Sequence, residues 1–196
     1  SVFVGILIMY TKLHWQAHFA SHVLRQGGVI AHPTEAVWGL ACHPFSEASV
    51  DTLLALKGRP AEKGLILVSA EVEHFSALLE PLSSTMKARF YAAQQRPTTW
   101  IIPDDENIMP AWIKGEHKGV AVRVSRHPDV AVLSRFFKGP VISSSANPSG
   151  KKPAMTVREV RQYFQARVDY VLSGSLGNAL RPSQIIDLKT GAVLRD

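Results

Sequence analysis

The chain alternates short apolar segments of strand composition with longer segments of helical periodicity, and this alternation limits its fold more than any other feature. The predicted strands are residues 29–31, 65–68, 98–102, 119–124, 141–142, 170–172 and 185–187. The predicted helices are residues 12–26, 49–57, 71–79, 82–94, 128–137 and 156–165. Strands separated by helices predict an α/β domain with a single twisted mixed sheet, in which ligands bind where strands end.

Length and composition favour one domain. The 196 residues are 46% hydrophobic, and no repeat or linker interrupts them, so we assign residues 12–196 to one domain. Residues 1–11 are assigned to a leader or a first strand. Their apolar run is shorter than the roughly 20 residues that span a membrane, so no membrane partner is expected. The single cysteine, Cys42, excludes an internal disulfide and favours a cytoplasmic location.

The predicted helix at residues 12–26 repeats apolar side chains every four positions, at Trp15, Phe19 and Val23, which we expect to face the core. A parallel stripe of histidines has the same spacing: His14, His18 and His22. That spacing suits a metal ion. However, the stripe carries no cysteine or carboxylate, so we interpret it as a solvated face and expect no metal site in the protein.

The charge distribution suits an anionic ligand. The net charge of +6 divides into +1 for residues 1–100 (8 basic, 7 acidic) and +5 for residues 101–196 (14 basic, 9 acidic). Such a balance fits nucleotide or RNA, although solubility alone also explains it. The P-loop, the dinucleotide-binding G-x-G-x-x-G, the G-x-S-x-G elbow and H-E-x-x-H are all absent from the sequence.

Polar side chains follow several of the apolar segments. Thr34 and Glu35 come directly after the first strand, although the same residues also suit the start of a helix. Lys57, Arg59 and Lys63 surround a helix end, where the helix dipole also favours cations by about 0.3–1 kcal/mol. The glycine and proline between them restrict the backbone. The cluster therefore favours a triphosphate site.

The segment VISSSANPSG at residues 141–150 ends a predicted strand with three serines and an asparagine. These exceed the polar side chains that one turn requires. Strand alternation predicts that Ser143, Ser145 and Asn147 share a face while Ser144 points away. Arg123 interrupts another apolar strand, where it either points to solvent or clamps a carboxylate.

Together these segments resemble the YrdC/TsaC family of threonylcarbamoyl-AMP synthases. The fragments PTEAVWGL, LKGRP, KGLILV, AVRVSRHP, SSSANPSG and PSQIID follow the order and spacing of that family between residues 32 and 187. The resemblance implies a YrdC-like fold with a deep basic cavity. It implies a nucleotidyltransferase that makes threonylcarbamoyl-AMP and pyrophosphate from L-threonine, bicarbonate and ATP. A tRNA threonylcarbamoyl transferase complex would then use the product to form threonylcarbamoyl-adenosine (t6A) in tRNA.

The resemblance also implies roles for the matching residues. Thr34, Arg123 and Ser183 would contact threonine, with Arg123 pairing with its carboxylate or with a phosphate. Lys57 and Arg59 would be the catalytic cations. The nucleotide would be held by Lys57, Arg59, Lys63, Thr99, Ser143, Ser145 and Asn147. Mg²⁺ is expected with the pyrophosphate, and the group that accepts the amine proton stays open between Glu35, bicarbonate and water.

Two features of the chain leave alternatives open. Arg96 precedes Pro97 where the family commonly has glycine, so an arginine beside the cavity would alter ligand access and weaken the assignment of Thr99. The chain resembles the short form of the family, without an additional C-terminal domain. The alternatives are a double-stranded RNA or tRNA binding module without catalysis, which would need surface cations, and a carbamoyl-adenylate-forming domain of a larger maturation protein.

Overall fold

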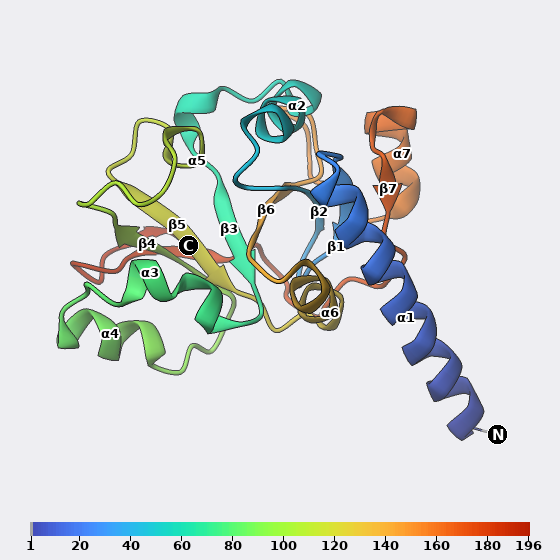
Figure 1. Cartoon of the computed structure of the whole chain (residues 1–196), viewed down its shortest axis with the longest axis horizontal. Helices are drawn as coiled ribbons and strands as arrows, with labels where there is room; N and C mark the ends of the chain where they lie inside the picture. Colours follow the sequence, from blue (N-terminus) through green and yellow to red (C-terminus); the bar gives the residue numbers. More distant parts are fainter. Residues whose placement is uncertain (1) are drawn as a thin grey trace.

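The computed structural model describes the backbone of residues 2–196 and the side chains of residues 13–196. Within this part of the chain, nine strands form one mixed sheet in the order β7-β1-β2-β6-β3-β5-β4-β8-β9. The pairs β1–β7, β3–β5 and β4–β8 are parallel and the other five are antiparallel. In Figure 1, α2 and α5 lie above the strands, and α3, α4 and α6 lie below them. The prediction of one α/β domain with a mixed sheet is confirmed.

All seven predicted strands are present, with small differences at their ends. The strands are β1 (Ile30–Pro33), β2 (Trp38–Cys42), β3 (Ile66–Ser69), β4 (Thr98–Pro103), β5 (Gly119–Val124), β6 (Val141–Ser145), β7 (Tyr170–Val171), β8 (Gln184–Asp187) and β9 (Val193–Arg195). Sequence analysis missed β2 and β9. The first contains a glycine and follows a segment that suits a helix start, and the second is a three-residue exposed strand at the sheet edge.

The helices agree less well in length. They are α1 (Val2–Arg25), α2 (Glu47–Lys57), α3 (Ser76–Leu79), α4 (Ser84–Tyr91), α5 (Ala111–Lys114), α6 (Pro128–Phe137) and α7 (Val157–Phe164), with 3-10 turns at Ala61–Lys63, Val72–Phe75 and Gln165–Arg167. The predicted helix at residues 71–79 divides into a 3-10 turn and α3. By contrast, α6 has its predicted bounds, and the predicted capping box of Thr156 and Glu159 begins α7.

The expectation of a strand within residues 1–11 is wrong, because residues 2–10 belong to α1. A short apolar run does not distinguish strand from helix, and here it continues the helix that follows it. In Figure 1, α1 extends past the sheet to the N-terminus at lower right. No helix in the described part of the chain is both long enough and apolar enough to cross a membrane.

The predicted core face of α1 is wrong at two of its three residues. Trp15 is 65% exposed and Phe19 is 42% exposed, whereas Val23 is partly buried and packs against the core. The buried residues of the helix include Ala17, Ala20 and Leu24. Small side chains let the helix approach its neighbours closely, while the Trp15 and Phe19 rings stack on each other at 5.9 Å. The described residues contain no cluster of three or more side chains suited to a metal ion.

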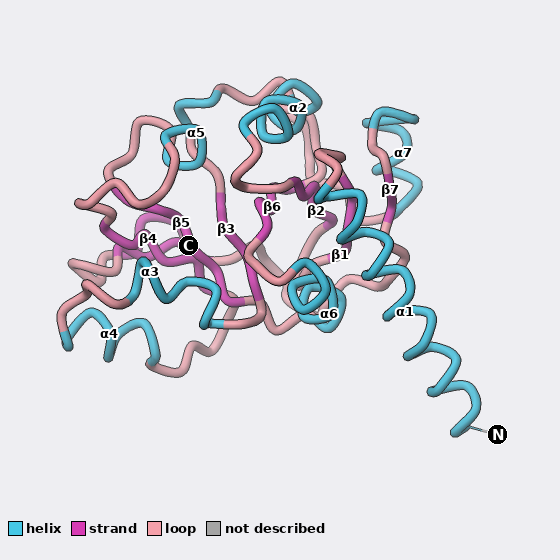
Figure 2. Tube along the Cα trace, in the orientation of Figure 1, coloured by secondary structure: helices cyan, strands magenta, loops and turns pink. Residues whose placement is uncertain are grey.

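The strands at the centre of the sheet bury both of their faces. Ile30, Ala41 and Val141 pack with α1 and α6 side chains in one cluster, whereas Leu40 and Ile142 belong to the main cluster. Figure 2 shows the strands in the middle of the molecule with the helices around them. Since side chains alternate along a strand, polar residues at the ends of β1 and β6 continue these two buried faces. The same strands that form the core therefore position the polar site.

Candidate functional site

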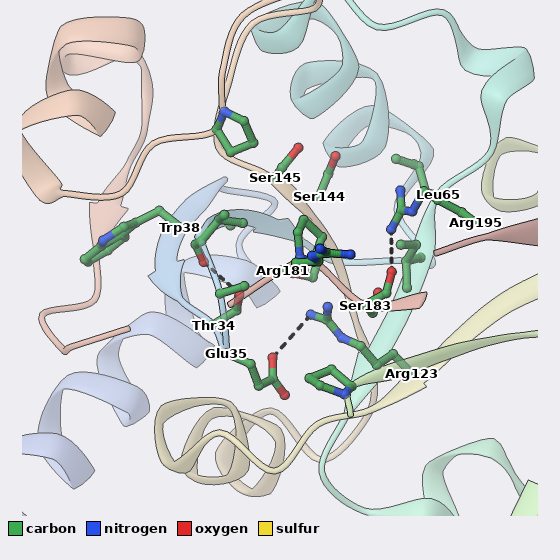
Figure 3. A pocket seen from close by; sticks show the side chains of 18 of the residues that line it. Thr34, Glu35, Trp38, Leu65, Arg123, Ser144, Ser145, Arg181, Ser183 and Arg195 are labelled. Atoms are coloured by element: carbon green, nitrogen blue, oxygen red, sulfur yellow. Dashed lines mark hydrogen bonds and ion pairs between the residues drawn. The ribbon is translucent and has the colours of Figure 1, made fainter. Parts of the chain in front are cut away.

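A cavity of about 250 Å³ lies at the end of β6, and segments far apart in the sequence meet there (Figure 3). Its lining comprises Thr34, Glu35, Ala36, Val37, Trp38, Gly39, Arg59, Leu65, Ile66, Pro97, Arg123, Ser143, Ser144, Ser145, Pro153, Arg181, Pro182, Ser183 and Arg195. Six of the predicted site residues belong to this lining: Thr34, Arg59, Arg123, Ser143, Ser145 and Ser183. Lys57, Lys63, Thr99 and Asn147 do not.

Thr34 and Glu35 lie in the turn that connects β1 with β2, and they do not begin a helix. Thr34 Oγ1 donates a hydrogen bond of 2.7 Å to Val37 O within this turn. Glu35 Oε1 accepts from Ser125 Oγ at 2.6 Å. Burial alone would raise the pKa of Glu35, but the positive charge of Arg123 and the Ser125 hydrogen bond hold the pKa below its usual value. Glu35 is therefore ionised at neutral pH.

Arg123 on β5 lines the cavity, which decides between the two orientations that the sequence left open. Its Nη2 lies 3.8 Å from Glu35 Oε2, and its side chain is 12% exposed. Burial lowers the pKa of this guanidinium, and the Glu35 charge opposes that effect. Its buried Nε has no hydrogen-bond partner in the described part of the chain. Arg123 therefore has a donor beside the cavity that its contacts with the protein do not satisfy.

The lining is rich in positive charge. It includes four arginines and one carboxylate, Glu35. Sequence analysis missed two of these arginines, Arg181 and Arg195. Arg195 lies on β9, where it donates a 2.9 Å hydrogen bond to Ser183 O, and Figure 3 shows this bond beside the cavity. No periodicity marked that short strand, so only the fold reveals its arginine. This excess of cations suits an anionic ligand.

The three predicted phosphate cations occupy different positions. Lys57 ends α2 and is buried, and its Nζ donates to Ser145 O and, at 2.9 Å, to Asn147 O. Burial and the Arg59 charge lower the pKa of Lys57 to about 8. Arg59 lines the cavity and donates to Gly64 O at 2.9 Å. Lys63 is exposed and lies outside the lining. Lys57 thus supports the serine segment from behind.

The serine segment differs in part from its prediction. Ser143, Ser144 and Ser145 all line the cavity, so the expectation that Ser144 points away from the site is wrong. These three serines are the last residues of β6, so the cavity borders the end of the strand. Asn147 lies beyond the lining, and its Nδ2 donates to Pro148 O at 3.0 Å and Lys151 O at 2.8 Å. Its amide stabilises the turn that follows the strand.

Thr99 and Arg96 lie next to the cavity without lining it. Thr99 is buried, and its Oγ1 is hydrogen-bonded to Ser183 Oγ over 2.8 Å, so it orients a lining residue. Arg96 Nε donates to Gln184 Oε1 at 3.0 Å, and its guanidinium also pairs with Asp196. Arg96 lines a second cavity of about 460 Å³. The expectation that this arginine alters access to the first cavity is therefore not supported.

The fold and the site define an α/β protein whose arginine- and serine-lined cavity suits a small anionic ligand. The chain belongs to the Sua5/YciO/YrdC family, because the family model described as "Telomere recombination" matches residues 22–196. It is 46% identical over 184 residues to the threonylcarbamoyl-AMP synthase of Cellvibrio japonicus, covering 94% of this chain and 97% of that protein. It is 47% identical over 181 residues to the synthase of Hahella chejuensis, covering 92% and 98%.

Solved structures share the fold. The crystal structure of P. abyssi Sua5 complexed with L-threonine superposes with a TM-score of 0.80 at 27% identity, over 92% of this chain. This chain spans about half of that Sua5 chain, 53% of its length. Escherichia coli YciO superposes with a TM-score of 0.78 at 21% identity, covering 93% of this chain and 89% of YciO. At that identity the likeness to YciO shows the fold alone.

Proposed function

We propose that this protein is a threonylcarbamoyl-AMP synthase, which joins L-threonine, bicarbonate and ATP. The observation that carries the proposal is the single cavity that brings Thr34, Arg123 and Ser183 together with Arg59 and the β6 serines. These side chains come from five separate parts of the chain. Identities of 46% and 47% with threonylcarbamoyl-AMP synthases over almost their whole lengths support the same reaction.

Threonine binds beside Arg123 in this proposal. The planar guanidinium suits the bidentate binding of a carboxylate, and its Nε has no partner in the described part of the protein. Thr34 and Ser183 line the same cavity and supply hydroxyl oxygens for the other polar groups of the amino acid. Thr99 acts indirectly, because its hydroxyl holds that of Ser183 at 2.8 Å.

The nucleotide phosphates bind toward Arg59 and the end of β6. Arg59 lines the cavity, and its guanidinium suits a phosphate oxygen there. Ser145 lines the same region. Lys57 contributes positive charge behind Ser145 and Asn147, and it contacts a phosphate only if Nζ exchanges one of its two carbonyl partners. Lys63 adds charge from the exposed side.

The proposed reaction has two bond-forming steps. The amine of threonine adds to bicarbonate with loss of water and gives a carbamate. A carbamate oxygen then attacks the α-phosphorus of ATP, and the bond to the β-phosphate oxygen breaks, releasing pyrophosphate. All reacting species are anionic, so fixed cations that bring them together lower the barrier by positioning and by charge stabilisation. Arg59 and Arg123 supply that charge inside the cavity, and Lys57 supplies it from behind.

Mg²⁺ fits this proposal as part of the nucleotide substrate. Mg²⁺ binds oxygen ligands and is usually held by one or two carboxylates together with substrate phosphates. The cavity lining offers one carboxylate, Glu35, which already interacts with Arg123 and Ser125. The donor set therefore does not form a magnesium site of its own. The ion would arrive on the ATP phosphates and neutralise the leaving pyrophosphate.

The wider biological setting is part of the same proposal. Threonylcarbamoyl-AMP would pass to a tRNA threonylcarbamoyl transferase complex in the cytoplasm, which would transfer the threonylcarbamoyl group to an adenosine of tRNA. The net charge of +6 would assist contact with tRNA. Binding of double-stranded RNA alone accounts less well for the site, because Thr34, Ser143 and Ser183 are buried and an RNA backbone requires surface cations.

Pyrophosphate release from ATP tests the proposed function. We expect release to require both L-threonine and bicarbonate, and to fall at least about tenfold in Arg123→Ala, which loses a charge-assisted hydrogen bond. Release that ignores threonine would contradict the synthase assignment. A tRNA gel shift at two salt concentrations tests RNA contact separately, since binding through phosphates weakens steeply with salt.

A further inference from the structure

His32 and Ser143 approach each other across β2 at the position of Gly39. His32 lies opposite Gly39 in the β1–β2 register, and Ser143 lies opposite Ala41 in the β2–β6 register. A Cβ atom at position 39 would lie 3.1 Å from both His32 Nε2 and Ser143 Oγ. That distance is tighter than nine in ten real contacts of a Cβ atom, so a side chain there would displace its neighbours. Glycine therefore leaves the gap through which the imidazole reaches the serine.

The hydrogen bonds of His32 determine which ring nitrogen carries the hydrogen. The ring is fully buried, and its Nδ1 lies 3.0 Å from Pro33 O, which can only accept. Nδ1 must therefore donate. Burial lowers the pKa of His32 to about 4, the Pro33 hydrogen bond opposes this, and the Arg123 and His127 charges lower it further. The ring is thus neutral at pH 7, so Nε2 carries a lone pair.

Ser143 must then use its hydrogen on the histidine. Ser143 Oγ lies 3.2 Å from His32 Nε2, which only accepts in this tautomer. A hydroxyl has one hydrogen, so Ser143 offers the cavity only acceptor lone pairs. Thr34 is in the same situation, because its Oγ1 donates to Val37 O at 2.7 Å. Ser143 and Thr34 both line the cavity, so each hydroxyl oxygen can there only accept a hydrogen bond from a ligand.

We propose that His32 is a positioning residue that fixes the Ser143 hydroxyl as a hydrogen-bond acceptor, so that Ser143 and Thr34 together bind the amino group of the amino-acid substrate. This inference rests on the proposed synthase function and deepens it. It moves Ser143 from the nucleotide end of the site, where the family resemblance places it, to the threonine end.

The chemistry favours an amino group over the hydroxyl groups of the substrates, and the arginine in the same lining favours the amino group of threonine over that of adenine. A hydroxyl carries one hydrogen and satisfies one acceptor, whereas an ammonium or amine carries two or three and satisfies both. Phosphate and carboxylate oxygens are acceptors and would face lone pairs there. Arg123, which suits the carboxylate, lines the same cavity as Ser143 and Thr34. One α-amino acid bound there would meet a cation for its carboxylate and two acceptors for its amino group.

Calorimetric titration without ATP tests this arrangement, because it requires no turnover. The variants are His32→Phe, Ser143→Ala and their combination, with His32→Gln as the conservative replacement that keeps an acceptor oxygen. The ligands are L-threonine and 3-hydroxybutanoate, which lacks the amino group. His22→Gln, at an exposed position on α1, is the matched control. Denaturant unfolding of each variant identifies any that fails to fold.

We expect His32→Phe and Ser143→Ala each to weaken L-threonine binding by about tenfold, the value of one hydrogen bond to a charged group. The double variant should bind no more weakly than Ser143→Ala, because His32 acts through Ser143. His32→Gln should bind within about threefold of the wild type, and 3-hydroxybutanoate binding should not change in any variant. In the pyrophosphate assay, the KM for threonine should rise while that for ATP stays constant.

The proposal would be overturned if the losses of threonine affinity in the two single variants multiplied in the double variant. A rise in the KM for ATP with unchanged threonine binding would also overturn it. A loss of threonine affinity in His32→Gln equal to that in His32→Phe would also overturn it. If the wild type releases no pyrophosphate, the synthase assignment fails by itself, and calorimetry still decides the role of His32.

Discussion

The side-chain Nζ of Lys57 donates a hydrogen bond of 2.9 Å to the main-chain oxygen of Asn147, and a second to that of Ser145. The end of α2 is thereby tied to the segment that follows β6. The main-chain N–H of Ser149 completes the connection by donating to Lys57 O at 2.6 Å. Lys57, which the family resemblance placed at the phosphates, therefore stabilises the loop that follows β6.

Lys57→Met is expected to lower both activity and stability. Methionine keeps an apolar stem of similar length but leaves two carbonyl groups without their donor, which costs about 1–3 kcal/mol of unfolding free energy. Pyrophosphate release should fall at least about tenfold because the serine segment loses its support and the site loses charge. Lys118→Met, at an exposed position, is the control and should change stability by less than about 0.5 kcal/mol. Wild-type stability in Lys57→Met would contradict a structural role for the amine.

The pH dependence of stability should report the same amine. Burial lowers the pKa of Lys57 from 10.5 to about 8, so between these values the unfolded chain binds more protons than the folded chain. The free energy of unfolding of the wild type, relative to Lys57→Met, should therefore rise as the pH increases from about 8 to about 10.5. Urea unfolding of both proteins across this range measures the difference. A constant difference would show that the amine has an ordinary pKa.

Glu35→Gln should weaken threonine binding more than ATP binding. The carboxylate lies 3.8 Å from the Arg123 guanidinium and accepts the Ser125 hydroxyl, so a neutral amide loses the charge that orients the arginine. We expect the KM for threonine to rise by about tenfold, the value of one charged hydrogen bond. Steady-state kinetics with each substrate varied in turn would detect it. An equal rise in both KM values would indicate a general distortion.

The wild type should also lose the contribution of Glu35 to stability in acid. The pKa of this carboxyl is lower in the folded protein than in the unfolded chain. Its contribution is therefore complete above the unfolded value and disappears as the pH falls through the folded value. The difference in unfolding free energy between the wild type and Glu35→Gln should shrink over that range. A difference independent of pH would contradict the assignment.

Sequence reasoning succeeded where residues close in the chain determine the structure. It failed where the structure depends on the pairing of distant strands in the sheet. The capping box of Thr156 and Glu159 was predictable because both partners lie within one helical turn. The order of the strands was not, because β6 pairs with β2 and β3, which are about 100 and 75 residues earlier in the chain. Arg195 reaches the cavity only through that order, so its role had no local signal.

Six of the ten site residues that the family resemblance implied belong to the cavity lining, but the resemblance did not tell which of the ten face the cavity and which lie behind it. Thr34, Arg59, Arg123 and Ser183 line the cavity as expected, whereas Lys57 and Thr99 lie one contact further out. A motif records which residues occur together, and it does not record which side chain lies behind another. The direction of the Ser143 hydroxyl depends on His32, which lies more than 100 residues away in sequence, and only coordinates reveal it.

Thr99→Val should have a modest effect through Ser183. The substitution preserves the shape of the buried side chain but removes the partner of the Ser183 hydroxyl, 2.8 Å away. We expect a loss of about 1 kcal/mol in unfolding free energy and a rise of a few-fold in the KM for threonine. Thr98→Val changes the neighbouring threonine, which faces Arg96 and Gln184, and should leave this KM unchanged. If both variants change the KM for threonine equally, Thr99 does not act on the site through Ser183.

Arg96→Gly introduces the residue that the family resemblance led us to expect before Pro97, and it should leave the affinity for ATP unchanged. The arginine donates to Gln184 Oε1 at 3.0 Å and pairs with Asp196, which directs it away from the lining of the first cavity. Its removal instead frees Asp196 and Gln184 at the sheet edge, and glycine increases the entropy of the unfolded chain, so stability should fall by about 1 kcal/mol. Nucleotide titration and urea unfolding measure the two effects. Tighter ATP binding in Arg96→Gly would show that the arginine does restrict access to the site.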